Sequence, residues 1–146
     1  MKTSTLISLV ALTLAALACS LVTGNDDISG ATVDEPLSAD LQIAFDELPT
    51  GDAVRGEQIF VVDQPCHICH IDLSIGPPFP GEPPLAILAA TRKPDYPAGV
   101  YLYESIVNPR AYVVQGFQAD AMPENFGKTL TRQDLADLVA YLMTMQ

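Results

Sequence analysis

Cys66, Cys69 and His70 lie in the middle of the chain and form the pattern C-x-x-C-H. This is the attachment pattern of a c-type haem. Two thiols at this spacing match the two vinyl-derived carbons on one edge of a haem, and the following histidine then lies under the ring. There its imidazole nitrogen can bind the iron. The motif therefore predicts one covalently bound haem with His70 as an axial ligand.

Two other chemistries also use a C-x-x-C pair. A structural zinc site needs four ligands, but the chain has no second C-x-x-C pair and no histidine after His70. A redox dithiol of the thioredoxin kind is expected next to a βαβ pattern. Here a Pro-rich loop and helical patterns surround the two cysteines. The sequence favours haem over both alternatives.

The N-terminus has the pattern of an export signal. Lys2 is followed by an uncharged apolar stretch that ends in small residues before Cys19. A positive start, a short apolar run and small residues are typical of a secretory signal peptide. The residues Ala16-Leu17-Ala18-Cys19 resemble the lipobox of bacterial lipoproteins, in which the peptide is cut before a cysteine that then carries lipid. We predict a signal peptide over residues 1–18 and a lipid anchor on Cys19.

An uncleaved N-terminal membrane helix is the alternative, because no charge occurs between Lys2 and Asp26, a stretch long enough for a membrane span of ~20 residues. Either way, the domain is expected to be tethered to the extracytoplasmic (periplasmic) face of a bacterial cell membrane. The three cysteines agree with this prediction. Cys19 is used for lipid, and Cys66 and Cys69 for haem.

The chain is strongly acidic, with 7 basic and 18 acidic residues and a net charge of −11. This balance excludes nucleic acid as a partner, since nucleic-acid binding needs a basic surface. It suits redox proteins with a basic or apolar docking patch. Residues 19–49 contain acidic residues, glycines and prolines but no basic residue, which predicts an acidic tether. Residues 41–45 are apolar enough to form a short ordered element on the domain.

The domain is expected over residues 50–146 and reads as all-α. Asp52 is a candidate N-cap of a helix that runs to about residue 62, and a middle helix is predicted over residues 98–107. Thr131 and Asp134 have the spacing of a capping box before the last helix. That helix has an apolar stripe at helical spacing, made of Leu135, Leu138, Val139 and Leu142.

From about residue 51 to the end, the chain resembles class I cytochrome c. The motifs that carry the resemblance, in order, are a helix with Gly56 and Phe60, the C-x-x-C-H motif, a Gly-Pro-x-Phe-x-Gly loop from residue 76, and Met122 before a last helix with Leu138 and Tyr141. The family has Leu where this loop has Phe79. The resemblance implies three or more helices around one haem, with Gly56 at the crossing of the first and last helices.

The sixth iron ligand is expected to be Met122. The other candidates are excluded one by one. His67 lies inside the attachment motif and is expected to point away from the iron, and Met1 is removed with the signal peptide. Met143 and Met145 lie at the end of the chain, where they are expected to be core residues. Met122 also occupies the family's position. The alternative is an open sixth site, or one taken by Lys128. The resemblance further implies that the carbonyl of Pro77 accepts a hydrogen bond from His70.

Other residues are additional candidates for contacts with the haem. Tyr101, Tyr103 and Tyr112 are candidates for the haem pocket or for hydrogen bonds to a propionate, with ordinary core packing as the alternative. Arg92, Lys93 and Arg110 are candidates to neutralise propionates, with solvated surface charge as the alternative.

These observations predict a membrane-anchored, single-haem protein with His–Met ligation that carries single electrons between extracytoplasmic partners of a respiratory or photosynthetic chain, and that is not an enzyme. A fixed haem subunit of a quinol-oxidising or oxidase complex is the first alternative. The others are a haem enzyme or gas sensor with an open sixth site, and a zinc-binding or purely structural lipoprotein.

Overall fold

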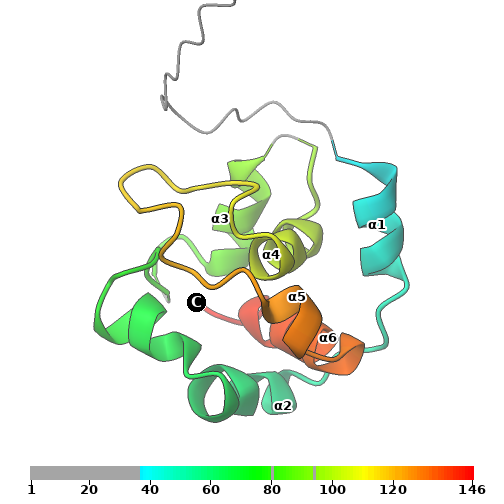
Figure 1. The fold of residues 1–146 in the computed structure, drawn as a ribbon, viewed down its shortest axis with the longest axis horizontal. Helices are drawn as coiled ribbons and strands as arrows, with labels where there is room; N and C mark the ends of the chain where they lie inside the picture. The colour runs from blue at the N-terminus through cyan, green and yellow to red at the C-terminus, as the bar shows by residue number, and fades with distance from the viewer. Residues whose placement is uncertain (1–36, 80, 94) are drawn as a thin grey trace, which may run out of the picture.

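A computed structural model describes residues 37–79, 81–93 and 95–146, which form helices and no strand (Figure 1). This confirms the all-α prediction. Of two π-helical segments, Ile59–Asp63 lies before the C-x-x-C-H motif, and Ile68–Asp72 begins inside the motif and ends two residues after it. The α-helices are α1 (Ala39–Asp46), α2 (Ala53–Gln58), α3 (Leu85–Arg92), α4 (Ala98–Val107), α5 (Phe126–Thr129) and α6 (Arg132–Leu142).

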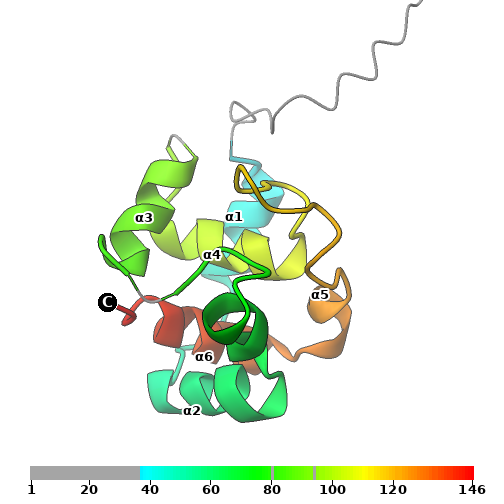
Figure 2. The same cartoon turned by 90° about the vertical axis from the view of Figure 1, so that its left-hand side faces the viewer.

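Helices α2 and α6 touch at a glycine. A Cβ atom at Gly56 would lie 2.0 Å from the carbonyl oxygen of Asp137 and 2.7 Å from Cβ of Tyr141, so only glycine allows this approach. The buried carboxylate of Asp137 also accepts a hydrogen bond of 2.7 Å from the backbone N–H of Asp52, the N-cap of α2. The predicted contact between Gly56 and the last helix is therefore present. Figure 2 shows α6 between α2 and α4.

Helix α6 begins and packs as its sequence predicts. The Thr131 hydroxyl accepts from the backbone N–H of Asp134, and the Asp134 carboxylate accepts from the backbone N–H of Thr131, which completes a capping box. The four residues of the predicted apolar stripe are all buried. They join the core with Phe60 of the first π-helical segment and with Val100, Leu102 and Ile106 of α4.

Helix α4 has the predicted bounds, whereas α3 and α5 were missed. Helix α3 follows Pro84, which offers no side-chain cap, and its eight residues carry a short apolar run after a Pro-rich loop. Helix α5 has only four residues, too few to show a helical period. The helix predicted to run from Asp52 to about residue 62 is α2, which ends at Gln58 and continues as π-helix to Asp63. The end of the helical segment is therefore close to the predicted one.

The tether prediction needs correction at its C-terminal end. Within the stretch predicted as tether, Ser38 caps α1, and Leu41 and Phe45 pack against the core. Phe45 contacts the ring of Tyr103 on α4 at a centroid distance of 6.0 Å and lies against Gly99. An acidic composition predicts a solvated chain, but these apolar side chains gain more from burial, as the apolar run over residues 41–45 had suggested.

The predicted signal peptide, Cys19 and the first part of the tether lie outside the described residues. Across the part of the chain that the structure describes, no helix has the length and apolar character needed to cross a membrane.

Candidate functional site

A cavity of about 380 Å³ lies between the C-x-x-C-H segment, α3, α4 and the loop that precedes α5. Its volume falls in the range of ~300–1,000 Å³ typical of small-molecule and cofactor sites. The cavity brings together residues that are far apart in the sequence. Those predicted for haem binding that line it are Cys66, Cys69, His70, Pro77 and Met122.

The imidazole of His70 is held on three sides. Its Nδ1 lies 2.9 Å from the carbonyl oxygen of Pro77, so that nitrogen donates the hydrogen bond and Nε2 keeps its lone pair. The ring of Phe79 stacks on the imidazole with centroids 4.6 Å apart and planes 5° from parallel. A Cβ atom at Gly76 would lie 2.8 Å from Cε1 of His70. The contact with Pro77 was expected, whereas the stacking on Phe79 was not.

Protonation in the cavity suits metal binding. Burial lowers the pKa of His70, although the hydrogen bond to Pro77 acts in the opposite direction. The imidazole is therefore neutral near pH 7, which is the form that binds metals. Burial raises the pKa of the Cys66 thiol to about 11. Reactive dithiols have lowered thiol pKa values, so this environment argues against a thioredoxin-like role.

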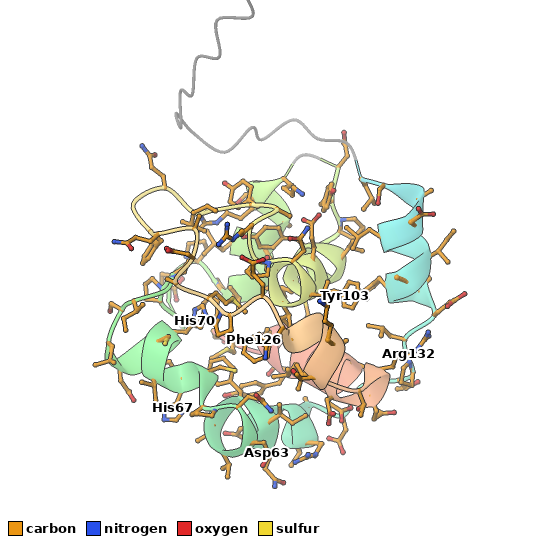
Figure 3. The ribbon with its side chains drawn as sticks, viewed as in Figure 1. Asp63, His67, His70, Tyr103, Phe126 and Arg132 are labelled. Carbon is orange, nitrogen blue, oxygen red and sulfur yellow. The ribbon has the colours of Figure 1, made fainter. Side chains whose placement is uncertain are left out.

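Met122 lies on the cavity wall in the loop before α5. The other ligand candidates lie elsewhere. Met143 is exposed, Met145 packs in the core, and Lys128 is exposed on α5. Figure 3 shows His70 and Phe126 in the middle of the molecule, whereas His67 lies nearer the outside. His67 does not line the cavity, and its Nε2 lies 3.7 Å from a carboxylate oxygen of Asp72.

The three candidate tyrosines for the haem pocket separate into two groups. Tyr101 and Tyr112 both line the cavity, with ring centroids 5.7 Å apart in an edge-to-face arrangement. Tyr103 faces Phe45 of α1 instead, so its candidacy for the cavity is wrong. Packing on an N-terminal helix could not be inferred from the spacing of the tyrosines alone.

The basic candidates also differ from one another. Arg92 lines the cavity. Lys93 is only 2% exposed and forms a 2.6 Å ion pair with Glu104, so the expected solvated charge is wrong at this position. Arg110 pairs with Glu124 and does not line the cavity.

The wall of the cavity fits a large, flat, apolar group with thiol and metal chemistry at one side. Apolar side chains from α3 and from the loop after α4 form much of it, and no pattern in the sequence predicted the contribution of α3. They include Leu85, Leu88, Ala89, Val113, Val114 and Phe117. The two thiols can form thioethers, and one imidazole and one thioether sulfur can ligate iron. Within the described ranges, no group of three or more His, Cys, Asp or Glu side chains could hold a metal ion by itself.

A family model, Cytochrome c, matches residues 53–146 of the chain. This span starts at α2, covers about two thirds of the sequence and contains all the residues that line the cavity. No curated protein and no solved structure matches the chain.

Proposed function

Because the chain belongs to the cytochrome c family, whose domains transfer electrons through one covalently attached haem c, we propose that it is a monohaem electron carrier with His70 and Met122 as the axial ligands of the iron. The observation that carries this proposal is the cavity. Cys66, Cys69 and His70 line it together with Met122, which lies more than 50 residues later in the chain.

The bound haem supplies an iron that changes oxidation state by one electron. The chain attaches it through the thiols of Cys66 and Cys69 and fixes the orientation of the His70 ring through Pro77 and Phe79. Met122 as the second axial ligand would raise the reduction potential and close the coordination shell. A closed shell leaves no site for O₂, which is the property of a carrier.

We further propose that the protein is lipid-anchored through Cys19 on the extracytoplasmic face of a bacterial membrane. The signal pattern and the lipobox-like residues before Cys19 support this placement. The net charge of −11 favours redox partners with a basic or apolar docking patch. Such partners belong to a respiratory or photosynthetic chain.

The test is the absorption spectrum of the full-length protein matured with its haem, in the oxidised and reduced states, with and without carbon monoxide. We expect a weak far-red band in the oxidised protein, lost in Met122→Ala, and no spectral change with carbon monoxide in the reduced wild type. Met143→Ala is the matched control, since Met143 lies outside the cavity. A carbon monoxide shift in the wild type would contradict the proposal and favour a haem enzyme or gas sensor.

A fixed haem subunit of a quinol-oxidising or oxidase complex is the second candidate, because a lipid anchor and a tether suit a subunit as well as a mobile carrier. The two differ in what purifies with the protein. Extraction from the membrane in mild detergent should release a carrier alone, whereas a subunit should remain with a large complex.

A further inference from the structure

Helix α1 packs against the domain although it lies outside the matched family span. It ends at Asp46, whereas the cytochrome c model begins at residue 53. Apolar residues of α1 and its flanks recur every three or four positions, so they share one face, and this face is half-buried against the core. These residues are Leu37, Leu41, Phe45 and Leu48. Ile43, by contrast, is 53% exposed.

Phe45 packs on a face of α4 that does not line the cavity. Its ring centroid lies 6.0 Å from that of Tyr103, and a Cβ atom at Gly99 would lie 2.8 Å from its Cζ atom. Gly99 and Tyr103 are four residues apart, so they share one face of α4. The α4 residues that line the cavity are Tyr101, Leu102 and Ser105. Figures 1 and 2 agree in placing α1 on the side of α4 away from the C-x-x-C-H segment.

The chain between α1 and α2 is held separately, along the first turns of α6. Arg132 donates a hydrogen bond to the backbone carbonyl of Glu47, and its guanidinium lies 3.4 Å from the carboxylate of the same residue. The side-chain amide of Gln133 donates a 3.0 Å hydrogen bond to the carbonyl of Thr50. A Cβ atom at Gly51 would lie 2.2 Å from a backbone oxygen of α6. These contacts do not involve α1, so residues 47–52 would keep their course if α1 were released.

Helix α1 depends on its docking. It has eight residues, and isolated helices shorter than ~12–15 residues are marginal in water. Its local hydrogen bonds, from the backbone of Leu41 to Ser38 and from Gln42 to Asp46, are exposed and stabilise a helix only slightly. The segment therefore has two states, a docked helix and an undocked chain, and the packing of Phe45 and Leu41 decides between them.

We propose that docking of α1 sets the point at which the lipid tether joins the haem domain and the length of that tether. This inference rests on the proposed anchor at Cys19. With α1 docked, the tether consists of the 17 residues 20–36, which span at most ~60 Å at ~3.5 Å per residue. With α1 released, it consists of the 27 residues 20–46, which span up to ~95 Å.

The docked helix therefore keeps the domain close to the membrane and leaves its haem-binding side accessible. The tether joins the domain on the side of α4 away from the C-x-x-C-H segment. A redox partner of this protein then exposes its own electron-transfer site within about 60 Å of the membrane surface, plus the width of the domain. Release of α1 would extend this distance by more than half.

The experiment follows electron transfer from the reduced, haem-loaded full-length protein on phosphatidylcholine vesicles to ferrocenium carried on a lipid headgroup. Each event oxidises one haem iron from Fe(II) to Fe(III) and reduces one ferrocenium to ferrocene. Phe45→Ala, alone and combined with Leu41→Ser, releases α1. The local concentration of a tethered group falls roughly as the −3/2 power of tether length, so the longer tether should slow the reaction about twofold.

Ile43→Ala is the matched control, because it removes an exposed apolar side chain from the same helix. It should leave the rate and the hydrogen-exchange protection of the amides of residues 39–46 unchanged, whereas Phe45→Ala should lose most of that protection. Soluble ferricyanide should oxidise all variants at the wild-type rate, since the tether does not limit that reaction. Removal of ten residues from the stretch 20–36 in Phe45→Ala should restore the wild-type rate with ferrocenium.

Loss of amide protection in Phe45→Ala without a slower reaction with ferrocenium would overturn the inference, as would protection that persists in the double variant. An equal slowing with ferricyanide would also overturn it, because the haem site and not the tether would then be affected. Failure of the proposed anchor gives a different result. The wild type would not remain on the vesicles and would react with ferrocenium as Cys19→Ser does.

Discussion

The orientation of the His70 ring is set by its immediate neighbours. The Pro77 carbonyl holds Nδ1, Phe79 covers one face of the ring, and the absence of a side chain at Gly76 gives the ring room. A hydrogen bond alone would leave the imidazole free to rotate about that contact. The stacked phenyl ring restricts this rotation, so Phe79 acts as a positioning residue for the proposed iron ligand.

Replacing Phe79 tests this role. In Phe79→Ala we expect a broadened or shifted low-spin electron paramagnetic resonance signal of the oxidised haem protein, because the ring plane of the axial imidazole is no longer fixed. Phe79→Leu, which restores the residue of the family motif, should lie between wild type and Ala. Phe117→Ala is the control, since Phe117 lines the same cavity without stacking on His70. An unchanged signal in Phe79→Ala would contradict the positioning role.

Some of the site could be predicted from residue types because its parts are contiguous in the sequence. Cys66, Cys69 and His70 share one turn, and Pro77 lies seven residues after His70. The sequence could not show whether Arg92 or Arg110 lines the cavity, because that depends on which of the two similar side chains faces it. Only the packing of α3 on α4 decides that question.

The crossing of α2 and α6 is sensitive to a single methyl group. In an isolated helix, Gly56→Ala should stabilise by about 1 kcal/mol. At this crossing the new Cβ would lie 2.0 Å from the carbonyl oxygen of Asp137, so the helices must separate. Overpacking of this kind typically costs ~1–3 kcal/mol, and we expect the steric cost to exceed the gain in helix propensity.

Chemical denaturation of the haem-loaded protein measures this effect. Gly56→Ala should lower the free energy of unfolding, whereas Gly81→Ala, where a Cβ would meet no atom within 4 Å, should leave it nearly unchanged. A more stable Gly56→Ala variant would show that helix propensity outweighs packing at this crossing.

The capping box of α6 gives the stability a component that depends on pH. The Thr131 hydroxyl, its backbone N–H and the charge of Arg55 lower the pKa of Asp134. The folded protein therefore binds this proton less tightly than the unfolded chain does. Stabilisation by the cap is complete above the unfolded pKa of ~3.9 and is lost as the pH falls through the lower folded value.

Asp134→Asn should therefore destabilise by about 1 kcal/mol near neutral pH, and the difference from wild type should shrink below pH ~4. Denaturation midpoints at several pH values test this, with the exposed Asp120→Asn as the control. A difference that stays constant down to strongly acidic pH would show that the Asp134 carboxylate does not contribute through its charge.

At the scale of elements, prediction succeeded where a helix carries its own signals. Helix α6 has a capping box and an apolar stripe, and α4 ends at Val107, with Asn108 as its C-cap before a proline. It missed α3 and foresaw only a short ordered element over residues 41–45 in place of α1, because the apolar residues of these helices are informative only together with the surface they pack on. Phe45 of α1 is half-buried because it packs on Gly99 and Tyr103 of α4.

At the scale of the whole molecule, the haem is expected to be part of the core. The cavity of about 380 Å³ lies between α3, α4 and the C-x-x-C-H segment, and its walls are mostly apolar. Without the haem, these apolar walls would be exposed to water, which is unfavourable. A small domain has only ~5–15 kcal/mol of stability in total, so losing the contacts of one large cofactor is a severe loss.

The double variant Cys66→Ser and Cys69→Ser, which cannot form the thioethers, should therefore be largely unfolded. We expect loss of most far-UV circular dichroism of helix and rapid cleavage by a protease, both measured on purified protein. Cys19→Ser is the matched control, because this residue lies outside the matched family span and the same substitution there should leave the helix content unchanged. Native helix content in the double variant would mean that the protein chain alone stabilises the walls of the cavity, and that the haem is added to a domain already folded.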